Sequence, residues 1–463
     1  MITGMLADAA AVMRGKLHGA DAPFRGVSTD SRTVESGELF FAFRGARADG
    51  AAFIADVASR RGAGAVGVEC QAATLPQIVV ADPRAAFGEL ARDWRLRFAI
   101  PLIGITGSNG KTTSKEMAAA IMRAWLADGS DTDPLLVTWG NLNNEIGLPR
   151  TLFYLGPQHR AAVLEMGAAK SGDIAYLVQI AKPTVSLLTN AARAHLEGFG
   201  TIDDVAATKG AIFDGLGSAG TAVINRDDRF FQQWWQRAAG SRRVTFGMHP
   251  DADVRASRIA TAEAGAGIRF DLHAAGATVP VQLHMAGPHN VMNALGTAAA
   301  TMAAGASLEA VVRGLNDVRN VAGRLRRVPA RARIALFDDT YNANPGSVRA
   351  AIGFLESLPG ECWLVLGDMA ELGVDSEAMH REMGAAAVRA GIARLYCAGP
   401  NSRAAASEFG ANAEWRETVV ELAELVAASV RPDITVLVKG SRSMGMERVV
   451  QALAAETQQA VGA

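Results

Sequence analysis

Between residues 98 and 322, short apolar runs alternate with longer stretches in which apolar residues recur every third or fourth position. Short apolar runs are typical of buried strands, and the longer period is typical of amphipathic helices. Regular alternation of the two predicts a mostly parallel sheet that is covered by helices on both faces. The expected strands are 102–106, 135–139, 161–166, 184–190 and 221–225.

The end of this segment has a different pattern. The stretch 252–285 is rich in Thr, Ala and Gly and indicates antiparallel hairpins, and a helix is expected over 289–304. Beyond it the strand–helix alternation returns, which predicts a second doubly wound sheet. Its expected strands are 334–337, 363–366, 394–397 and 435–438, with helices that include 376–390 and 419–429.

The first hundred residues mix shorter strands and helices, which indicates a small α/β domain. A helix is expected near 53–61, and strands over 65–69 and 77–80. Because the chain is too long for one ordinary domain, we expect an α/β protein of several domains. The expected boundaries are 1–97, 98–322 and 323–463.

Composition narrows the possible partners. The chain has 46 Lys and Arg against 47 Asp and Glu, so no basic surplus points to nucleic acid. No apolar run is long enough to span a membrane, and Asp8 interrupts the N-terminal apolar stretch, so we expect neither membrane insertion nor a signal peptide. Cys70, Cys362 and Cys397 are widely spaced and are expected to be buried and unpaired, which fits a reducing cytoplasm.

The strongest chemical signal is the stretch Leu102–Glu116, which combines an apolar strand, the turn TGSNGKTT and the start of a helix. Gly107 and Gly110 allow a tight turn in which backbone N–H groups converge on one point. The helix N-terminus and the Lys111 ammonium add positive charge there. The turn is therefore predicted to bind the phosphates of a nucleotide.

This turn is a compact variant of the general P-loop, because Ile105 stands where the general pattern has its first glycine. Thr112 or Thr113 can offer a hydroxyl group to Mg²⁺. The residues expected to bind ATP here are Gly107, Ser108, Asn109, Gly110, Lys111, Thr112 and Thr113.

Polar residues follow the next strands of the predicted sheet. Glu165 ends one strand, where an acid commonly holds Mg²⁺, although a strand-end acid can also simply meet solvent. His195 follows another strand and could ligate a metal, orient a phosphate or lie on the surface. Asn143 and Asn144 belong to an Asn-rich turn that could bind a polar ligand or serve only as a turn.

Further candidates come from the helices after these strands. By pattern alone Lys209, on a helix expected over 202–216, is a solvated lysine. Asn290 and Asn293 lie one helical turn apart and could contact a nucleotide base, or Asn290 could cap the helix. Arg324, between the second and third units, could reach a phosphate or be solvated.

Polar loops follow several strands of the third unit, namely Phe337–Pro345, Leu366–Gly373 and Val438–Arg442. The carboxyl ends of parallel strands meet at one edge of a sheet, which is where open α/β sheets bind ligands. The candidate ligand-binding residues in these loops are Asp339, Asn344 and Lys439.

Taken in order, these motifs resemble the Mur ligases, ATP-dependent enzymes that add amino acids to the peptidoglycan precursor. The resemblance covers nearly the whole chain and rests on TGSNGKTT, EMG, AHLEGFG, the Lys209 helix, GPHNVMNA and GRL. In the third unit, DDTYNANPGS, LGDMAELG and KGSRSMGME are similar to the branch of the family that adds a D-alanyl-D-alanine dipeptide. The DNPR-type motif of the branch that adds the third residue is not found in the sequence.

The resemblance implies a first domain that binds the UDP end of the substrate and a central P-loop domain that binds ATP. It implies a C-terminal Rossmann-like ligase domain that closes on ATP and the incoming dipeptide. The implied cofactors are ATP and a pair of magnesium ions, and the implied substrates are UDP-N-acetylmuramoyl-tripeptide and D-alanyl-D-alanine. We expect a cytoplasmic monomer.

The resemblance also assigns site residues. Ser31 and Arg32 fall in the uridine-nucleotide segment, and Asn143, Asn144, Asn344 and Lys439 are expected to contact substrate. Asn290, Asn293, Arg324 and Asp339 are expected to hold ATP. Thr112, Glu165, His195 and a carbamylated Lys209 are the expected magnesium ligands, and Lys111, Lys209 and His195 the expected catalytic residues.

The role expected of Lys209 changes most with this resemblance, because the matching lysine is carbamylated in most Mur ligases. Carbamylation turns a cation into a carboxylate that can bind Mg²⁺. The chain departs from the family at Ala211, where an acid is usual, and in Gly50–Phe53, where relatives commonly have a histidine after glycine.

The implied reaction is ATP-dependent formation of a C–N bond through an acyl phosphate. It would give UDP-N-acetylmuramoyl-pentapeptide, ADP and phosphate in peptidoglycan synthesis. The alternatives are a ligase of the folylpolyglutamate synthase type and a P-loop regulatory ATPase without ligase chemistry. The second alternative has no need for a set such as Glu165, His195 and Lys209.

Overall fold

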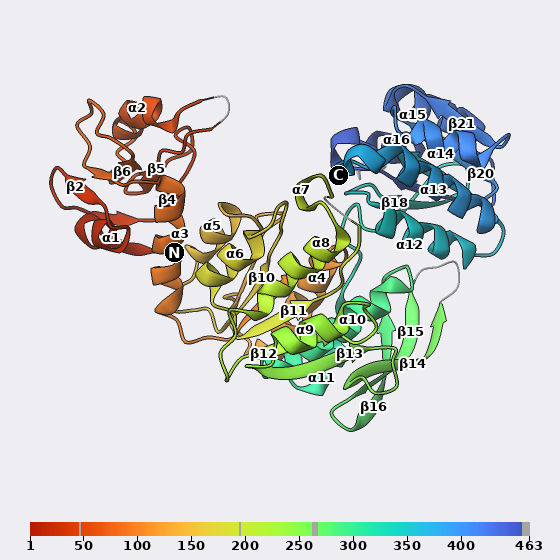
Figure 1. Ribbon diagram of the computed structural model, residues 1–463, viewed down its shortest axis with the longest axis horizontal. Helices are drawn as coiled ribbons and strands as arrows, with labels where there is room; N and C mark the ends of the chain where they lie inside the picture. The colour runs from red at the N-terminus through yellow and green to blue at the C-terminus, as the bar shows by residue number, and fades with distance from the viewer. Residues whose placement is uncertain (46–47, 194–195, 262–266, 456–463) are drawn as a thin grey trace, which may run out of the picture.

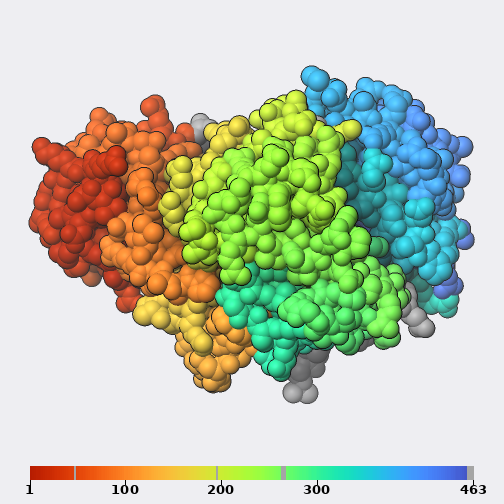
Figure 2. Space-filling view, turned by 60° about the horizontal axis from the view of Figure 1, so that its bottom comes forward, coloured from red at the N-terminus to blue at the C-terminus, as the bar shows by residue number. Residues whose placement is uncertain are grey.

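The computed structural model describes residues 1–45, 48–193, 196–261 and 267–455. Each of the units contains one main sheet, and the first unit also contains a two-stranded antiparallel sheet. Figure 1 shows the units side by side: the first in red, the central one from orange to green, and the third in blue. In the space-filling view of Figure 2 the blue third unit abuts the yellow-green part of the central unit. No helix in the described ranges is long and apolar enough to cross a bilayer.

The first unit holds a five-stranded sheet in the order β2-β7-β6-β5-β4, and β1 pairs with β3 beside it. Its strands are short, and the sheet is parallel except where β2 joins β7. The elements are β1 (Thr3–Met5), α1 (Leu6–Val12), β2 (Lys16–His18), β3 (Pro23–Arg25), β4 (Val27–Ser28), β5 (Leu39–Phe41), α2 (Ile54–Ser59), β6 (Gly64–Gly67), β7 (Gln77–Val79) and α3 (Pro83–Leu96).

The first and central units share one hydrophobic core. Helix α3 packs on α5 (Gly147–Leu152) and α6 (Asp173–Ala181) of the central unit. At this contact the rings of Phe87 and Phe153 meet edge to face with centroids 5.1 Å apart. Both rings are buried in a cluster that includes Leu6 of the first unit and Trp234 of the central unit. The two units are therefore joined by apolar packing rather than by a loose linker.

The central unit is built on a nine-stranded sheet in the order β16-β15-β14-β13-β12-β11-β8-β10-β9. The pairings from β9 to β14 are parallel, and β14, β15 and β16 are antiparallel. The expected hairpins therefore exist and extend this sheet. Since β8 lies between β10 and β11, the strand order reverses at β8, where open α/β sheets form a crevice for ligands.

The strands of the central unit lie close to the positions predicted from the sequence. The strands expected over 102–106 and 221–225 have those bounds, and the neighbouring strands end one to two residues earlier than expected. The strands are β8 (Leu102–Thr106), β9 (Leu135–Val137), β10 (Ala161–Glu165), β11 (Val185–Leu188), β12 (Thr221–Asn225), β13 (Arg242–Gly247), β14 (Val254–Thr261), β15 (Ile268–Ala274) and β16 (Ala277–Leu283). The helices besides α5 and α6 are α4 (Lys111–Leu126), α7 (Leu196–Phe199), α8 (Ile202–Gly210), α9 (Phe231–Arg237), α10 (His289–Ala303) and α11 (Leu308–Asp317).

The third unit has a six-stranded sheet in the order β17-β18-β22-β19-β20-β21, parallel except for β17. The predicted doubly wound layout is confirmed, and its two buried clusters lie on opposite faces of the sheet. Its elements are β17 (Arg326–Val328), β18 (Ala335–Asp339), α12 (Pro345–Glu356), β19 (Glu361–Gly367), α13 (Ser376–Arg389), β20 (Arg394–Ala398), α14 (Ser402–Phe409), β21 (Ala413–Arg416), α15 (Val419–Ser429), β22 (Ile434–Lys439) and α16 (Glu447–Leu453).

Two expectations about single elements were wrong. Cys70 is exposed, because β6 ends at Gly67 and the chain then bends outward, whereas Cys362 and Cys397 are buried and unpaired as expected. The helix expected over 202–216 ends at Gly210 and continues as a short 3₁₀ turn, Ala211–Phe213.

Candidate active site

A cavity of about 1190 Å³ lies at the carboxyl edge of the central sheet and is lined by all the units. The P-loop and β10 form its floor, third-unit residues such as Lys439 cover one side, and Asp82 and Arg84 at the start of α3 line its far end. Most of the predicted site residues line it: Ser108, Asn109, Gly110, Lys111, Thr113, Asn143, Asn144, Glu165, Asn290, Asn293, Arg324, Asp339, Asn344 and Lys439.

Other predicted residues lie elsewhere. Gly107, Thr112 and Lys209 stand just outside the lining of this cavity, and His195 lies outside the described residues. Ser31 and Arg32 belong to a turn of the first unit away from it. There the Arg32 guanidinium donates to the Asp30 carboxylate at 2.7 and 2.9 Å and lowers the pKa of Asp30 to about 2. Ser31 and Arg32 are therefore not part of this cavity, and their role in binding the uridine nucleotide stays a prediction.

The glycines of the P-loop are required by close packing. Gly110 has φ +83°, and a Cβ there would lie 2.2 Å from Oδ1 of Asn293. A Cβ on Gly107 would lie 1.9 Å from Oγ1 of Thr189. Thr189 and Asn190 also hold the loop by hydrogen bonds, because Asn190 Oδ1 accepts from the N–H of Asn109 at 3.0 Å and the Thr189 hydroxyl donates to the Asn109 carbonyl at 2.7 Å.

Gly110→Ala is therefore expected to weaken binding of ADP by at least about tenfold, because the methyl group would displace Asn293 and the loop. The matched control is Gly129→Ala, since Gly129 has nearly the same φ, +80°, and no atom within 4 Å of its Cβ position. Calorimetric titration of both variants with ADP checks this. Equal losses in the two variants would assign the effect to backbone strain and contradict the packing argument.

Lys111 provides the mobile charge of the loop. Its Nζ donates to the carbonyl of Gly107 at 2.7 Å, so the ammonium lies over the turn. Burial lowers the pKa of Lys111, the nearby Glu165 carboxylate opposes this shift, and Arg324 adds to it. The negative charge of a bound phosphate would offset the cost of burying this ammonium group.

Glu165 is the acid that the sequence placed at the strand end, and it does not meet solvent: it is only 2 % exposed. Its Oε1 accepts a hydrogen bond from Nδ2 of Asn143 at 2.7 Å, and its Oε2 is buried without a partner. A buried carboxylate oxygen without a partner is unfavourable unless a cation or donor completes it. Its placement in the cavity fits a magnesium ligand.

The hydroxyl groups of Thr112 and Thr113, the other candidate ligands on the P-loop, differ in their access to the cavity. The Thr112 hydroxyl accepts a hydrogen bond from Nη2 of Arg324 at 3.0 Å, and Thr113 rather than Thr112 faces the cavity. Within the ranges that the structure describes, no three His, Cys, Asp or Glu side chains cluster tightly enough to hold a metal. Among the described residues Glu165 is therefore not part of such a cluster, and its role as a magnesium ligand stays a prediction.

Lys209 is buried, so the solvated position suggested by pattern alone was wrong: the side chain is 1 % exposed. Its Nζ lies 5.8 Å from the ring centroid of Phe199, and none of the described residues forms an ion pair with it. Burial lowers the pKa of Lys209 well below its usual value, Lys111 lowers it further, and Asp173 opposes the shift. A lysine in these surroundings favours its neutral amine form.

Asn290 does not cap helix α10, which begins at His289 after Pro288. The Asn290 side chain is buried, its Nδ2 donates to the Ala286 carbonyl at 2.6 Å, and its Oδ1 accepts from Nδ2 of Asn293 at 2.9 Å. The two amides therefore form one buried pair behind Gly110. Both residues line the cavity, Asn293 packs against Gly110, and their predicted contact with ATP stays a prediction.

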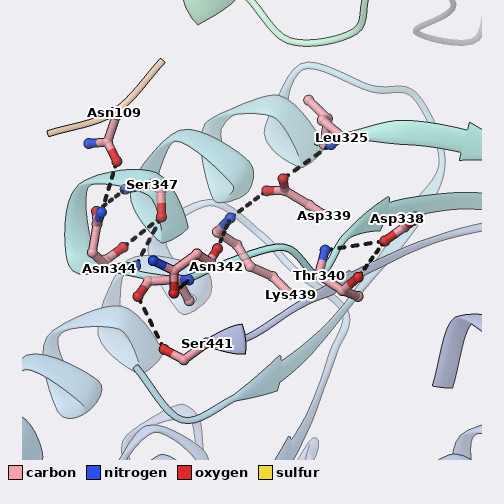
Figure 3. A network of polar contacts seen from close by, with 11 residues as sticks. Asn109, Leu325, Asp338, Asp339, Thr340, Asn342, Asn344, Ser347, Lys439 and Ser441 are labelled. Carbon is pink, nitrogen blue, oxygen red and sulfur yellow. Dashed lines mark hydrogen bonds and ion pairs between the residues drawn. The ribbon is translucent and has the colours of Figure 1, made fainter. Parts of the chain in front are cut away.

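The third unit reaches the cavity through a polar network (Figure 3). Lys439 is buried and donates to Oδ2 of Asp339 at 2.6 Å and to the Asn342 carbonyl at 3.0 Å. The second carboxylate oxygen of Asp339 accepts from the N–H of Leu325 at 3.1 Å. Asp339 and Lys439 therefore fix the segment that follows Arg324, in addition to lining the cavity.

Direct contacts join this unit to the P-loop. Asn344 caps α12 and also donates from Nδ2 to Oδ1 of Asn109 at 2.8 Å, as Figure 3 shows. The Arg324 guanidinium lies 3.9 Å from the ring centroid of Tyr341 and reaches Thr112. The third unit is therefore in direct contact with the P-loop in this structure.

Sequence reasoning missed several supporting residues. Thr189, Asn190, His289 and Tyr341 line the cavity. The first two are polar residues at the carboxyl end of the strand expected over 184–190, which was an available signal. Conversely, Asp368 of the motif LGDMAELG supports the fold of the third unit. Its carboxylate accepts hydrogen bonds from the N–H groups of Asn401 and Ser402 at the start of α14.

Family models match along the chain. A Mur ligase family catalytic domain matches residues 23–95, the Mur ligase middle domain residues 105–301, and the Mur ligase glutamate ligase domain residues 323–442. The chain therefore belongs to the Mur ligase family.

Full-length relatives narrow this further to the MurF branch. The chain is 42% identical over 458 residues to the UDP-N-acetylmuramoyl-tripeptide–D-alanyl-D-alanine ligase of Escherichia coli, covering 98% of this chain and 99% of that protein. MurF from Acinetobacter baumannii superposes with a TM-score of 0.91 at 32% identity, covering 97% of this chain and 98% of that one. MurF from Thermotoga maritima in complex with ADP gives 0.83 at 26% identity, covering 92% and 96%.

Proposed function

We propose that this protein is an ATP-dependent ligase that joins D-alanyl-D-alanine to UDP-N-acetylmuramoyl-tripeptide and yields the pentapeptide nucleotide, ADP and phosphate. The observation that carries this proposal is the cavity in which a P-loop, a buried carboxylate with an unpartnered oxygen and the polar loops of the third unit meet. The full-length similarity to enzymes with this name supports the choice of substrates.

The reaction has two chemical steps. The terminal carboxylate of the tripeptide attacks the γ-phosphorus of ATP, the bond to the β-phosphate oxygen breaks, and ADP leaves. The amine of D-alanyl-D-alanine then attacks the carbonyl carbon of the acyl phosphate, loses a proton, and inorganic phosphate leaves from the tetrahedral intermediate. Anionic reactants meet in the first step, so the site must neutralise charge.

The residues of the cavity suit these demands. The P-loop amides and Lys111 would hold the β- and γ-phosphates, and Asn143 keeps the Glu165 carboxylate pointed at the same space. Magnesium, when bound, would supply charge neutralisation on the phosphates. Glu165, the hydroxyl group of Thr112 or Thr113 and a carbamylated Lys209 are the ligands we propose for it, and His195 stays a prediction.

Closure protects the intermediate. An acyl phosphate is hydrolysed by water, so the reacting groups must be shielded while the amine attacks. In the structure Asn344 and Arg324 contact the P-loop directly. Their position favours a role in closing the site, and we assign Asn344 to closure rather than to direct substrate contact.

The proposal predicts that product forms only when ATP, the nucleotide tripeptide and D-alanyl-D-alanine are all present. Mass spectrometry of the reaction should show the pentapeptide nucleotide with one phosphate released per amide bond. Turnover with folate and glutamate in place of these substrates would contradict it in favour of a folylpolyglutamate synthase. Phosphate release without any amide product would instead support a regulatory ATPase. A monomeric state and a cytoplasmic location remain part of the proposal.

A further inference from the structure

Lys115 is a buried lysine that the proposed chemistry does not use. It lies on α4, one helical turn after Lys111, and is 2 % exposed. Its Nζ donates to the carbonyls of Thr138 at 3.0 Å and Gly140 at 3.4 Å, and it also lies 3.0 Å from the Glu116 carboxylate. Burying an ammonium group is costly, and an apolar side chain of the same length would avoid that cost.

The two carbonyls belong to the turn that leads from β9 to the Asn-rich segment, and this turn contacts Glu165 from two sides. The Thr138 hydroxyl accepts from the backbone N–H of Glu165 at 2.9 Å. A few residues further on, Asn143 donates to the Glu165 carboxylate and accepts through its carbonyl from the N–H of Gly167 at 2.8 Å. The turn and the segment that follows it therefore fix the positions of both the backbone and the carboxylate of Glu165.

Lys115 thus connects the two halves of the site. The first turn of α4 carries the phosphate-binding lysine, and the next turn carries the ammonium that holds the 138–140 turn. We propose that Lys115 is a positioning residue that keeps the Glu165 carboxylate aligned with the nucleotide phosphates. This inference rests on the proposed function, because it takes Glu165 as the magnesium ligand.

The test uses the full-length protein and ADP as the probe, titrated calorimetrically at a series of Mg²⁺ concentrations. Lys115→Met keeps the length and the burial of the side chain but removes its charge and its hydrogen bonds. We expect the Mg²⁺ concentration for half-maximal enhancement of ADP binding to rise about tenfold, as for loss of a group that orients a metal ligand. Binding of ADP without Mg²⁺ should stay within about twofold of the wild type, because the P-loop contacts are unchanged.

Two further variants separate positioning from general stability. Lys115→Arg keeps a charged donor and should recover part of the Mg²⁺ response, and it replaces Lys115→Met if that variant does not fold. Glu116→Gln removes the ion pair but leaves both carbonyl contacts, so it should behave as the wild type. A loss in Glu116→Gln equal to that in Lys115→Met would overturn the proposal.

The outcomes also distinguish the two levels of inference. Suppose that the wild type forms the amide product and that Mg²⁺ enhances its binding of ADP. If Lys115→Met and Lys115→Arg then show the same dependence on Mg²⁺ as the wild type, Lys115 is not a positioning residue. If the wild type forms no amide product, the proposed function fails. If Mg²⁺ has no effect on ADP binding by the wild type, the magnesium role of Glu165 fails, and the role of Lys115 with it.

Discussion

Lys209→Ala is expected to lower the ligation rate by on the order of a thousandfold or more, and added acetate or another short carboxylate should restore part of it. The reason is the state of this side chain: it is fully buried near Lys111, and burial lowers its pKa well below the usual value. Only the neutral amine of a lysine can react with carbon dioxide to form a carbamate. The truncation leaves a space in which a free carboxylate can replace that group.

The matched control for this result is Lys209→Met. Methionine fills the space and cannot be carbamylated, so this variant should lose activity equally and gain nothing from acetate. The measurement is the rate of pentapeptide formation with and without acetate in both variants. Full activity of Lys209→Met would remove the carbamate from the mechanism, and rescue of Lys209→Met by acetate would show that the carboxylate acts elsewhere.

Glu165→Gln should have the second large effect, a loss of at least about a hundredfold in ligation. Glutamine has the same shape and can still accept from Asn143 through its carbonyl oxygen. It removes the negative charge that we assign to magnesium binding. The opposite effect is expected on the free protein, because the variant buries a neutral amide group where the wild type buries a negatively charged oxygen without a partner.

Ligation rate and the melting temperature of the ligand-free protein are therefore to be measured together. A variant that is inactive and melts at the same or a higher temperature than the wild type supports the assignment. An inactive variant with a much lower melting temperature would mean that Glu165 stabilises the fold instead. Unchanged activity would exclude Glu165 as a magnesium ligand.

Strands and the phosphate-binding turn could be predicted because their signals are local. A short apolar run that is bounded by turn residues, such as Leu102–Thr106, is typical of a buried strand, and the glycines beside it indicate a tight turn. The residues that depend on packing between distant segments gave no such signal. Lys209 and Lys115 lie in ordinary helical sequence, and only the fold shows that both are buried.

Asn290 illustrates the same limit in another way. An asparagine near the start of a helix is a good cap by local rules, but here Pro288 and His289 begin the helix before it. The asparagine is left on the inner face, where its amide binds the Ala286 carbonyl. Tertiary packing thus places Asn290 in the lining of the cavity and not at the helix cap, and its contact with a nucleotide stays a prediction.

The core shared by the first and central units has a consequence for substrate choice. Since Phe87 and Phe153 pack in one cluster, the first unit and the unit that carries the P-loop are joined by a continuous apolar core. The third unit has its own cores and reaches this body through polar contacts such as that of Asn344 with Asn109. Under the proposed function, we therefore expect this core to hold the site for the uridine end at a nearly fixed distance from the P-loop. We expect nucleotide-peptides that are shorter or longer than the tripeptide to be poor substrates for that reason.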